Sequence, residues 1–330
     1  MLNLGKIVGI LIGLQLSIPH ILSQELQPLR KARPALGTTV SIKCYGRDTV
    51  QALSAIEEAY HLLDSLNLIF SDYNPESEIR QIAKNYRKGV PISVSQPLYD
   101  LTAKATELGR LTEGSFNIAV GALTQLWRSY LAEKRIPPGN LIRKFKRQLK
   151  ERNLQLQPPD KLIFKKDRMR LDFGGIAKGY IGDQMAKKLR EKGIGIFLID
   201  LGGDLVAGDA PPDSDGWKIT ISWCEKIVTI VNQSIATSGP DFQFHVYQGK
   251  RYSHIIDPKS GWGVSDFFGC TVIAGSGYEA DALASAFSIL PFARSTEILS
   301  RKADIAAIIG RNSELISSDN FSEYVVSDGR

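Results

Sequence analysis

The sequence predicts an α+β fold in which helices flank a mixed or largely antiparallel sheet. Between residues 49 and 153, apolar residues recur at helical spacing in several successive segments. From residue 160 onward, short strand-like stretches dominate. Helices and strands that are segregated along a chain in this way are typical of an α+β fold, whereas a doubly wound parallel sheet alternates strand and helix throughout.

The first predicted strand covers residues 37–46, where apolar and polar residues alternate. A long amphipathic helix follows at 49–70, with Asp48 or Thr49 as its cap. After a turn with a short helix at 71–85, three more helices are predicted, at 97–114, 120–134 and 139–153.

The second half begins with an apolar strand that ends in "LDFGG" (171–175). A helix at 176–193 and a buried strand at 196–204 come next. Residues 244–257 have the pattern of a hairpin, which turns at Gln248 and Gly249.

Length and composition are those of an ordinary globular protein. The chain has 330 residues, which suffices for one large domain or two modest ones, and 43% of its residues are hydrophobic. With 23% charged residues, wholesale disorder is excluded. A net charge of +6 is mildly basic and suits anionic ligands, but it is not the concentrated basic patch of a nucleic-acid-binding protein.

Residues 1–23 have the three-part layout of a secretory signal peptide. A lysine precedes an apolar stretch at 7–18, and "PHILSQ" then offers a cleavage site after Ser23. The apolar stretch is too short for a membrane span, although an uncleaved anchor is the lesser alternative. No cysteine follows it directly, which argues against a lipid-modified N-terminus. We expect one domain at 24–330, located in the periplasm or at the outer face of the inner membrane.

The three cysteines, Cys44, Cys224 and Cys270, lie in or beside apolar stretches. Their spacing matches no metal site, and their odd number leaves at least one unpaired. Burial as small hydrophobic residues is the favoured interpretation, with one disulfide as the alternative.

The stretch from Leu171 to Leu205 contains two Gly-Gly pairs, and Lys178 closely follows the first pair. Glycine allows a ligand or another chain to approach the main chain closely. Neither a GxGxxG nor a P-loop motif is present, but a helix start with a nearby lysine still suits an anion, and Asp172 offers a hydrogen-bond acceptor. The alternative is a tight strand-helix turn with a surface lysine.

Two further groups of residues suggest chemistry. His254 and Asp257 lie where the predicted hairpin runs into a Pro-Lys-Ser-Gly turn, and histidine exchanges a proton readily near neutral pH. Asp281 and Ser285 are four residues apart, so on a helix their oxygens face the same way and suit Mg²⁺. A structural histidine and a helix cap are the respective alternatives.

Eight segments, in their order along the chain, resemble the ApbE family of FAD:protein FMN transferases. The resemblance covers nearly all of the chain after about residue 30. The segments are "LGTTVSI", "DYNPESEI", "GSFNIAVGALTQLW", "DFGGIAKGYIGD", "LIDLGGDLVAGD", "SIATSG", "YSHIIDPKSG" and "ADALASAF".

The resemblance implies an ApbE-like fold of two lobes with the FAD site between them. Family members hold FAD with Mg²⁺ at its pyrophosphate. They transfer the FMN half through a phosphoester bond to a threonine or serine of another protein and release AMP. Here the acceptor would be an exported or membrane-bound flavoprotein, with no role for nucleic acid.

The resemblance also assigns roles to particular residues. The Gly175 carbonyl, Asp281 and Ser285 would hold Mg²⁺. His254 would help deprotonate the acceptor hydroxyl, and Asp257 is the second catalytic candidate. The residues that would contact FAD are Leu36, Tyr73, Ser115, Phe116, Asn117, Asp172, Lys178 and Ile255.

Three positions depart from the family pattern. Leu36 stands where methionine is usual, and Ser285 replaces threonine but keeps a ligand oxygen. In "FNIAVG" the family usually has F-D-P-T-V-G, so Asn117 replaces an aspartate. On sequence grounds alone we expect this exchange to weaken FAD binding by about 1 kcal/mol, and Asn117→Asp to strengthen it.

Two alternatives to the transferase remain open at this stage. One is a non-catalytic FAD-binding protein, which Asn117 favours, and the other is a pyrophosphatase that splits FAD into FMN and AMP. The presence of Lys178, His254, Asp257 and Asp281 favours an enzyme.

We predict that the mature protein begins near Gln24, because the signal-peptide layout ends at Ser23. N-terminal sequencing or intact mass of protein from the native host measures this directly. A soluble cytoplasmic chain that still carries Met1 to Ser23 would contradict the prediction.

Overall fold

The structure is a computed structural model, described here for residues 25–239, 244–247, 250–253, 255–264, 267–311 and 314–326. Its main feature is an eight-stranded sheet in the order β1-β2-β6-β7-β10-β13-β14-β15, in which every neighbouring pair is antiparallel. The strands are β1 (Gln27–Ala35), β2 (Thr38–Gly46), β6 (Phe197–Asp200), β7 (Leu205–Ala207), β10 (Ser234–Ser238), β13 (Phe267–Ala274), β14 (Ala306–Arg311) and β15 (Glu314–Ser317). The predicted α+β class with a largely antiparallel sheet is confirmed.

Smaller sheets complete the strand content of the described residues. One has the order β3-β5-β4, and two are single hairpins, β8-β9 and β11-β12. Their bounds are β3 (Pro91–Ser93), β4 (Leu154–Gln157), β5 (Lys161–Phe164), β8 (Trp217–Ile221), β9 (Lys226–Ile230), β11 (Phe244–Tyr247) and β12 (Lys250–Ser253).

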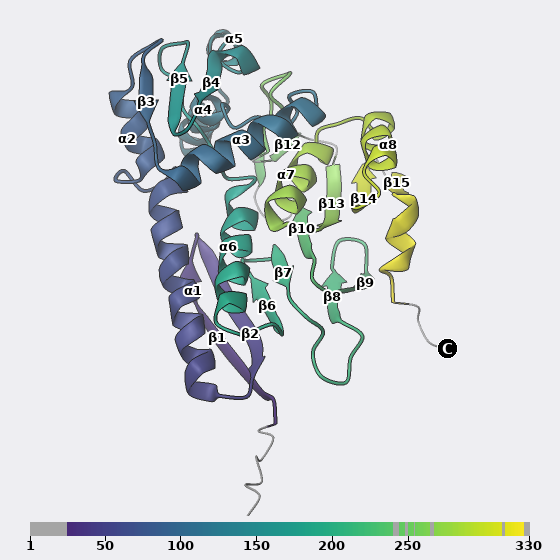
Figure 1. Cartoon of the computed structure of the whole chain (residues 1–330). Helices are drawn as coiled ribbons and strands as arrows, with labels where there is room; N and C mark the ends of the chain where they lie inside the picture. The colour runs from purple at the N-terminus through teal and green to yellow at the C-terminus, as the bar shows by residue number, and fades with distance from the viewer. Residues whose placement is uncertain are drawn as a thin grey trace, which may run out of the picture.

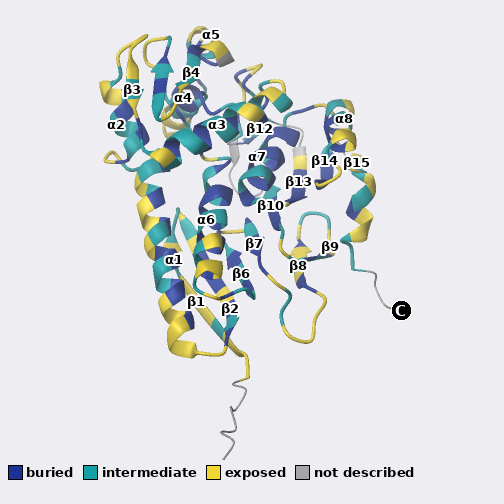
Figure 2. Ribbon diagram, viewed as in Figure 1, coloured by how far each residue is buried: buried dark blue, intermediate teal, exposed yellow. Residues whose placement is uncertain are grey.

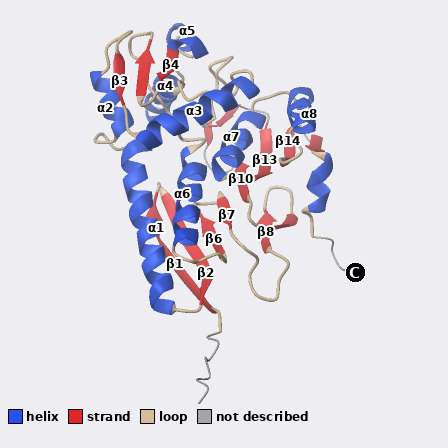
Figure 3. Cartoon of the chain, viewed as in Figure 1, coloured by secondary structure: helices blue, strands red, loops and turns tan. Residues whose placement is uncertain are grey.

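The helices divide between the face of the main sheet and a mainly helical part at one end of the molecule. In Figure 1, α1, α6 and α7 lie against the sheet, whereas α2 to α5 gather with the small sheet at the top. Figure 3 shows helices in blue in both regions, with red strands of the small sheet beside α2 and α5 at the top. The bounds are α1 (Thr49–Phe70), α2 (Glu78–Asn85), α3 (Gln96–Leu111), α4 (Gly121–Ala132), α5 (Gly139–Lys146), α6 (Ala177–Glu191), α7 (Gly277–Phe287) and α8 (Phe292–Arg301), with short 3₁₀ turns at Glu151–Asn153 and Asp319–Glu323.

Helix α1 has the predicted bounds and the predicted cap. The Asp48 carboxylate accepts hydrogen bonds from the backbone N–H groups of Val50 (2.8 Å) and Gln51 (3.1 Å). One stripe of the helix is buried in the main core while the other is exposed, as the blue and yellow sides of α1 show in Figure 2. The apolar period of the sequence therefore determines which side of this helix packs inward.

Helix α5 is shorter than predicted. It ends at Lys146 instead of continuing to residue 153. The carbonyl groups of Arg147 and Gln148, which a longer helix would use internally, accept hydrogen bonds from the Asn153 amide at 3.1 Å. Side-chain hydrogen bonds thus compete with the helical ladder and stop it.

Two other predictions are settled by the structure. The predicted hairpin is present, because β11 and β12 pair from Phe244↔Ser253 to Tyr247↔Lys250. All three cysteines are free, with Cys44 and Cys270 buried, so the disulfide alternative is wrong.

Helices α6 and α7 cross with their backbones in contact. A Cβ atom at Gly179 would overlap the Gly277 carbonyl, so only glycine fits at this crossing. The Asp183 side chain of α6 also accepts hydrogen bonds from the N–H groups of Gly277 (2.6 Å) and Tyr278 (3.1 Å). It thereby satisfies two of the otherwise unpaired donors in the first turn of α7.

Within the part of the chain that the structure describes, we find no helix with both the length and the apolar character needed to cross a membrane.

We predict that Gly179→Ala destabilises the protein by about 1–3 kcal/mol, because the added methyl group forces α7 away from α6. The gain in helix propensity from alanine, about 1 kcal/mol, opposes this effect without removing the overlap. Chemical denaturation measures the change in the free energy of unfolding. Gly275→Ala is the matched control, since a Cβ there has no neighbour within 4 Å. Unchanged stability of Gly179→Ala would show that the helices do not cross in this way.

Candidate active site

The three predicted metal ligands lie together where α6 meets α7. A Cβ atom placed on Gly175 would be 2.8 Å from the Ser285 hydroxyl oxygen, so the Gly175 backbone and this hydroxyl are adjacent. Asp281 lies one turn before Ser285 on α7, is 6% exposed, and accepts a hydrogen bond from the Gly179 N–H at 3.2 Å. A backbone carbonyl, a carboxylate and a hydroxyl are hard oxygen donors and fit Mg²⁺.

This donor set contains one acidic side chain. No group of three or more His, Cys, Asp or Glu gathers as a metal site within the described ranges. A metal here would therefore depend on backbone, hydroxyl and water oxygens, which is common for Mg²⁺ because it keeps several of its waters.

The charges around Asp281 are closely spaced. Burial, together with the nearby Asp204 carboxylate, raises the pKa of Asp281 to about 7. Lys178 forms an ion pair with Asp204, which is 5% exposed. Burial alone would lower the pKa of Lys178, but Asp204 and Asp281 raise it well above its ordinary value, so the ammonium stays charged. The site thus holds a permanent cation between two carboxylates.

The two Gly-Gly pairs belong to one site. Gly202 and Gly203 form the turn between β6 and β7 with positive φ angles of +79° and +100°, and their N–H groups donate to Asp200 at 2.9 Å. Asp204 follows this turn and pairs with Lys178, which follows the pair Gly174–Gly175. A single ion pair therefore joins the two glycine turns.

Leu36 lies close to the second glycine turn. It occupies the tight connection between β1 and β2 with a φ of +54° and is partly buried against the core. Thr38, two residues later, is in contact with Gly202. The connection that carries Leu36 therefore lies beside the second glycine turn.

The "SFN" segment extends from the helical part to Gly175, one of the predicted metal ligands. Phe116 would lie 3.6 Å from a Cβ on Gly175, which places this segment beside the first glycine turn. The Ser115 hydroxyl oxygen is buried and has no hydrogen-bond partner among the described residues. A buried hydroxyl without a partner is unfavourable in a folded protein, so it fits a ligand that supplies the missing bond.

Asn117 is engaged with the protein's own backbone. Its Nδ2 donates to the Leu149 carbonyl at 2.7 Å, and its Oδ1 accepts from the Ala119 N–H at 2.9 Å. An aspartate could not donate the first of these bonds. The amide therefore ties the "SFN" turn to the segment that follows α5, a role that the sequence did not indicate.

Asp172 and Tyr73 meet around an arginine that sequence analysis did not single out. Asp172 accepts hydrogen bonds from Thr124 (2.7 Å), from the Gly174 N–H (2.8 Å) and from Arg128 (3.4 Å). The Arg128 guanidinium also lies 4.6 Å from the centre of the Tyr73 ring. The helical spacing of Thr124 and Arg128 puts them on one face of α4, but the sequence alone does not say what that face contacts.

The third predicted segment is described only in part. His254 lies outside the described residues, so its role stays a prediction. Ile255 is partly buried, and its carbonyl accepts a hydrogen bond from the Val264 N–H at 3.0 Å. The Asp257 carboxylate accepts from the N–H groups of Lys259 (2.8 Å) and Ser260 (3.0 Å). Asp257 therefore stabilises its own turn, and a catalytic part for it also stays a prediction.

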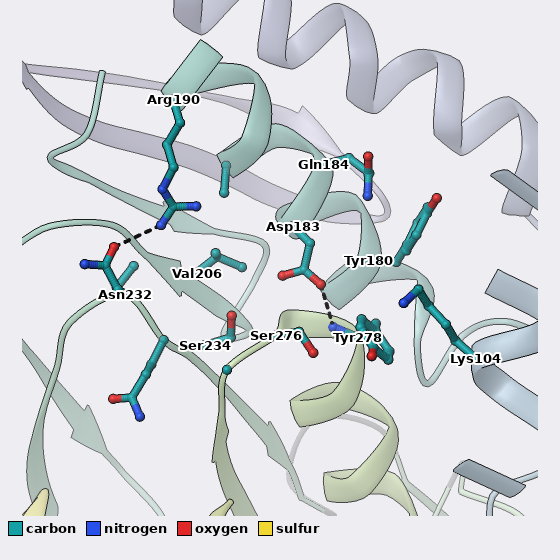
Figure 4. A pocket seen from close by; sticks show the side chains of 14 residues that line it. Lys104, Tyr180, Asp183, Gln184, Arg190, Val206, Asn232, Ser234, Ser276 and Tyr278 are labelled. Atoms are coloured by element: carbon teal, nitrogen blue, oxygen red, sulfur yellow. Dashed lines mark hydrogen bonds between the residues drawn. The ribbon is translucent and has the colours of Figure 1, made fainter. Parts of the chain in front are cut away.

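A cavity of 290 Å³ lies on α6 and the start of α7, and none of the predicted site residues lines it. Figure 4 shows Asp183 pointing from α6 toward the first turn of α7, and Arg190 bonded to Asn232. Burial raises the pKa of Asp183 to about 6, against the effect of its two backbone hydrogen bonds. We regard this region as the support that fixes α7, and hence Asp281, in position.

The chain is similar to named proteins over most of its length. The family model described as "ApbE family" matches residues 36–309 of the chain. A protein named FAD:protein FMN transferase from Klebsiella pneumoniae is 28% identical over 293 residues, which cover 86% of this chain and 89% of that protein. A protein of the same name from Treponema pallidum is 26% identical, covering 82% and 80%.

Solved structures show the same fold. The flavin transferase ApbE from Vibrio cholerae superimposes with a TM-score of 0.80 at 23% identity, covering 91% of this chain and 100% of that one. The ApbE protein from Thermotoga maritima gives a TM-score of 0.81 at 22% identity, with the same coverage.

We predict that Asn117→Asp destabilises the protein by about 1–3 kcal/mol and does not strengthen FAD binding, in contrast to the expectation from sequence alone. The exchange removes the donor to Leu149 and places a carboxylate against that carbonyl oxygen. Chemical denaturation and titration of flavin fluorescence measure the two effects. Asn140→Asp, at an exposed position of α5, is the control. Tighter FAD binding by a fully stable Asn117→Asp protein would contradict the structural role.

Proposed function

The chain belongs to the ApbE family, and we propose that it is an exported, Mg²⁺-dependent FAD:protein FMN transferase. In this proposal it attaches FMN by a phosphoester bond to a threonine or serine of an exported or membrane-bound flavoprotein and releases AMP. The observation that carries the proposal is the convergence of Gly175, Asp281 and Ser285 where α6 meets α7.

Mg²⁺ would be held by the Gly175 carbonyl, the Asp281 carboxylate and the Ser285 hydroxyl. When bound, the ion would offset the negative charge that develops on the phosphoryl oxygens. Asp281 is suited to this task because its main protein hydrogen bond, from Gly179, occupies only part of its acceptor capacity. The raised pKa of Asp281 also supports the proposal, since a buried carboxylate gains most from a cation.

FAD would be bound by residues from both parts of the molecule. Lys178 supplies a permanent positive charge to the pyrophosphate side, while Asp204 holds its side chain in place. Ser115 and Asp172 offer a free hydroxyl and a carboxylate to polar groups of the nucleotide. Leu36, Tyr73, Phe116 and Ile255 complete the proposed FAD contacts, while the Asn117 amide holds the "SFN" turn in place.

His254 would act as the general base. It would take the proton from the acceptor hydroxyl, whose oxygen then attacks the phosphorus of the FMN half while the bond to AMP breaks. A hydroxyl is a weak nucleophile at neutral pH, which is why a base is needed. Asp257, three residues later, would support the histidine through the rigid turn that its carboxylate stabilises.

The structure weakens the case for a non-catalytic flavin-binding protein. That alternative rested on Asn117 in place of an aspartate, and the amide has a structural use in this chain. The reaction products distinguish FAD hydrolysis from transfer of FMN to an acceptor.

The experiment incubates the purified protein with FAD, Mg²⁺ and an exported flavoprotein from the same host as the candidate acceptor. Flavin fluorescence of the denatured acceptor and chromatography of released AMP are measured together. Acceptor-bound flavin with AMP supports the transferase, whereas free FMN with AMP identifies a pyrophosphatase. FAD binding with neither product identifies a flavin-binding protein.

We predict that Asp281→Ala abolishes the metal-dependent reaction, because water cannot position the ion as that carboxylate does. Glu279→Ala is the matched control on the same helix, since Glu279 pairs with Lys302 at 3.3 Å instead of approaching Gly175. Full metal-dependent turnover by the Asp281→Ala protein would contradict the metal assignment.

His254→Ala is expected to lower turnover by roughly 10²–10⁴-fold with FAD binding preserved. Loss of folding by the His254→Ala protein would instead indicate a structural histidine.

A further inference from the structure

Helix α4 connects two acidic segments that are far apart in the sequence. Asp72 follows α1, and Asp172 precedes α6. Gln125 donates to the Asp72 carboxylate at 3.1 Å, and Thr124 donates to the Asp172 carboxylate at 2.7 Å. One face of a single helix therefore receives both carboxylates.

Arg128, one turn further along α4, bridges the two acids with its planar fork. Its Nη1 forms an ion pair with Asp72, and its Nη2 lies 3.4 Å from Asp172. The two carboxylates are 6% and 9% exposed. Burial and the neighbouring Asp172 both raise the pKa of Asp72, which shows that the two acids repel each other. The guanidinium offsets that repulsion, and its two-pronged shape matches two separate acceptors.

Arg128 also supports an exposed aromatic ring. Tyr73 is 78% exposed, and the guanidinium carbon of Arg128 lies 4.6 Å from its ring centre. Since the guanidinium covers one face of the ring, the opposite face is left for another partner. A ring so exposed keeps a defined orientation only if something holds it.

We infer that Arg128 is a positioning residue of the nucleotide site, which holds Asp172 and the Tyr73 ring in one arrangement so that a ring system of FAD stacks on the free face of Tyr73. The inference rests on the proposed function, because FAD is the ligand in question. Arg128 itself acts through Tyr73 and Asp172 and does not touch FAD.

The test is a double-mutant cycle on FAD affinity, measured by quenching of flavin fluorescence. Arg128→Met keeps the length of the side chain but removes the guanidinium, and Tyr73→Leu removes the ring. Each single variant is expected to weaken FAD binding by roughly tenfold, and the double variant by little more than either one. Arg128→Lys is expected to restore only part of the affinity, because an ammonium group does not bridge two carboxylates. The loss is expected mainly in the FAD concentration that gives half-maximal rate and less in the maximal rate, since the metal and base are untouched.

Arg128→Met leaves the buried Asp72 carboxylate with the longer contact to Arg80 at 3.7 Å and the hydrogen bond from Gln125, and so endangers folding. Arg128→Met combined with Asp72→Asn removes this weakly compensated charge and keeps the experiment valid. The inference expects FAD binding to remain weak in this protein, because the ring is still unsupported. Recovery of full affinity would overturn it, since Arg128 would then serve only to neutralise Asp72.

Arg135→Met is the matched control. Arg135 lies 5.2 Å from the Tyr130 ring and pairs with Glu133 at 2.9 Å, so it makes the same kinds of contact just beyond the end of α4. FAD affinity is expected to be unchanged in this variant. Additive effects of Arg128→Met and Tyr73→Leu would overturn the inference, because they would mean that the arginine binds FAD itself.

FAD binding by the wild-type protein distinguishes a failure of the proposed function from a failure of the role of Arg128. A wild-type protein that binds no FAD would contradict both the proposed function and the role of Arg128. Wild-type binding with unchanged affinity in Arg128→Met would contradict only the role of Arg128.

Discussion

The backbone contact between α6 and α7 is the constraint on which the rest of the site depends. Because Gly179 and Gly277 lack side chains, the two helices approach until main-chain atoms meet. This crossing determines where the next turns of α7 lie, and those turns carry Asp281 and Ser285. The Asp183 carboxylate secures the same crossing by bonding to the first N–H groups of α7. A close crossing with a side-chain cap is stiffer than either contact alone, which is what the proposed metal site would require of its ligands.

Buried carboxylates join the remaining segments through their cationic partners. Lys178 and Asp204 connect the two glycine turns, and Arg128 connects Asp72 with Asp172. Taking a charge out of water is unfavourable unless it is paired, so each of these contacts fixes the relative position of the segments that supply it. Contacts within the chain therefore hold these side chains in position.

Several residues of the family motifs also serve the protein's own backbone. Asn117 holds the turn after Phe116 to Leu149, and Asp257 closes the turn that contains Lys259 and Ser260. The Trp127 indole donates to the Gly261 carbonyl at 2.9 Å, so α4 reaches this turn as well. A motif residue can thus be required for the shape of the site without touching a substrate, and the departure at Asn117 is of this kind.

The sequence by itself determined the features that depend on neighbouring residues. The bounds and cap of α1, the glycine turns, the β11-β12 hairpin and the common face of Asp281 and Ser285 all follow from local spacing and backbone preference. Only the tertiary structure decided that Gly175 lies beside Ser285, that Arg128 bridges two acids, and that the Asn117 amide binds Leu149. These contacts join segments tens of residues apart, and their partners are chosen by how helices and turns pack, which no local pattern encodes.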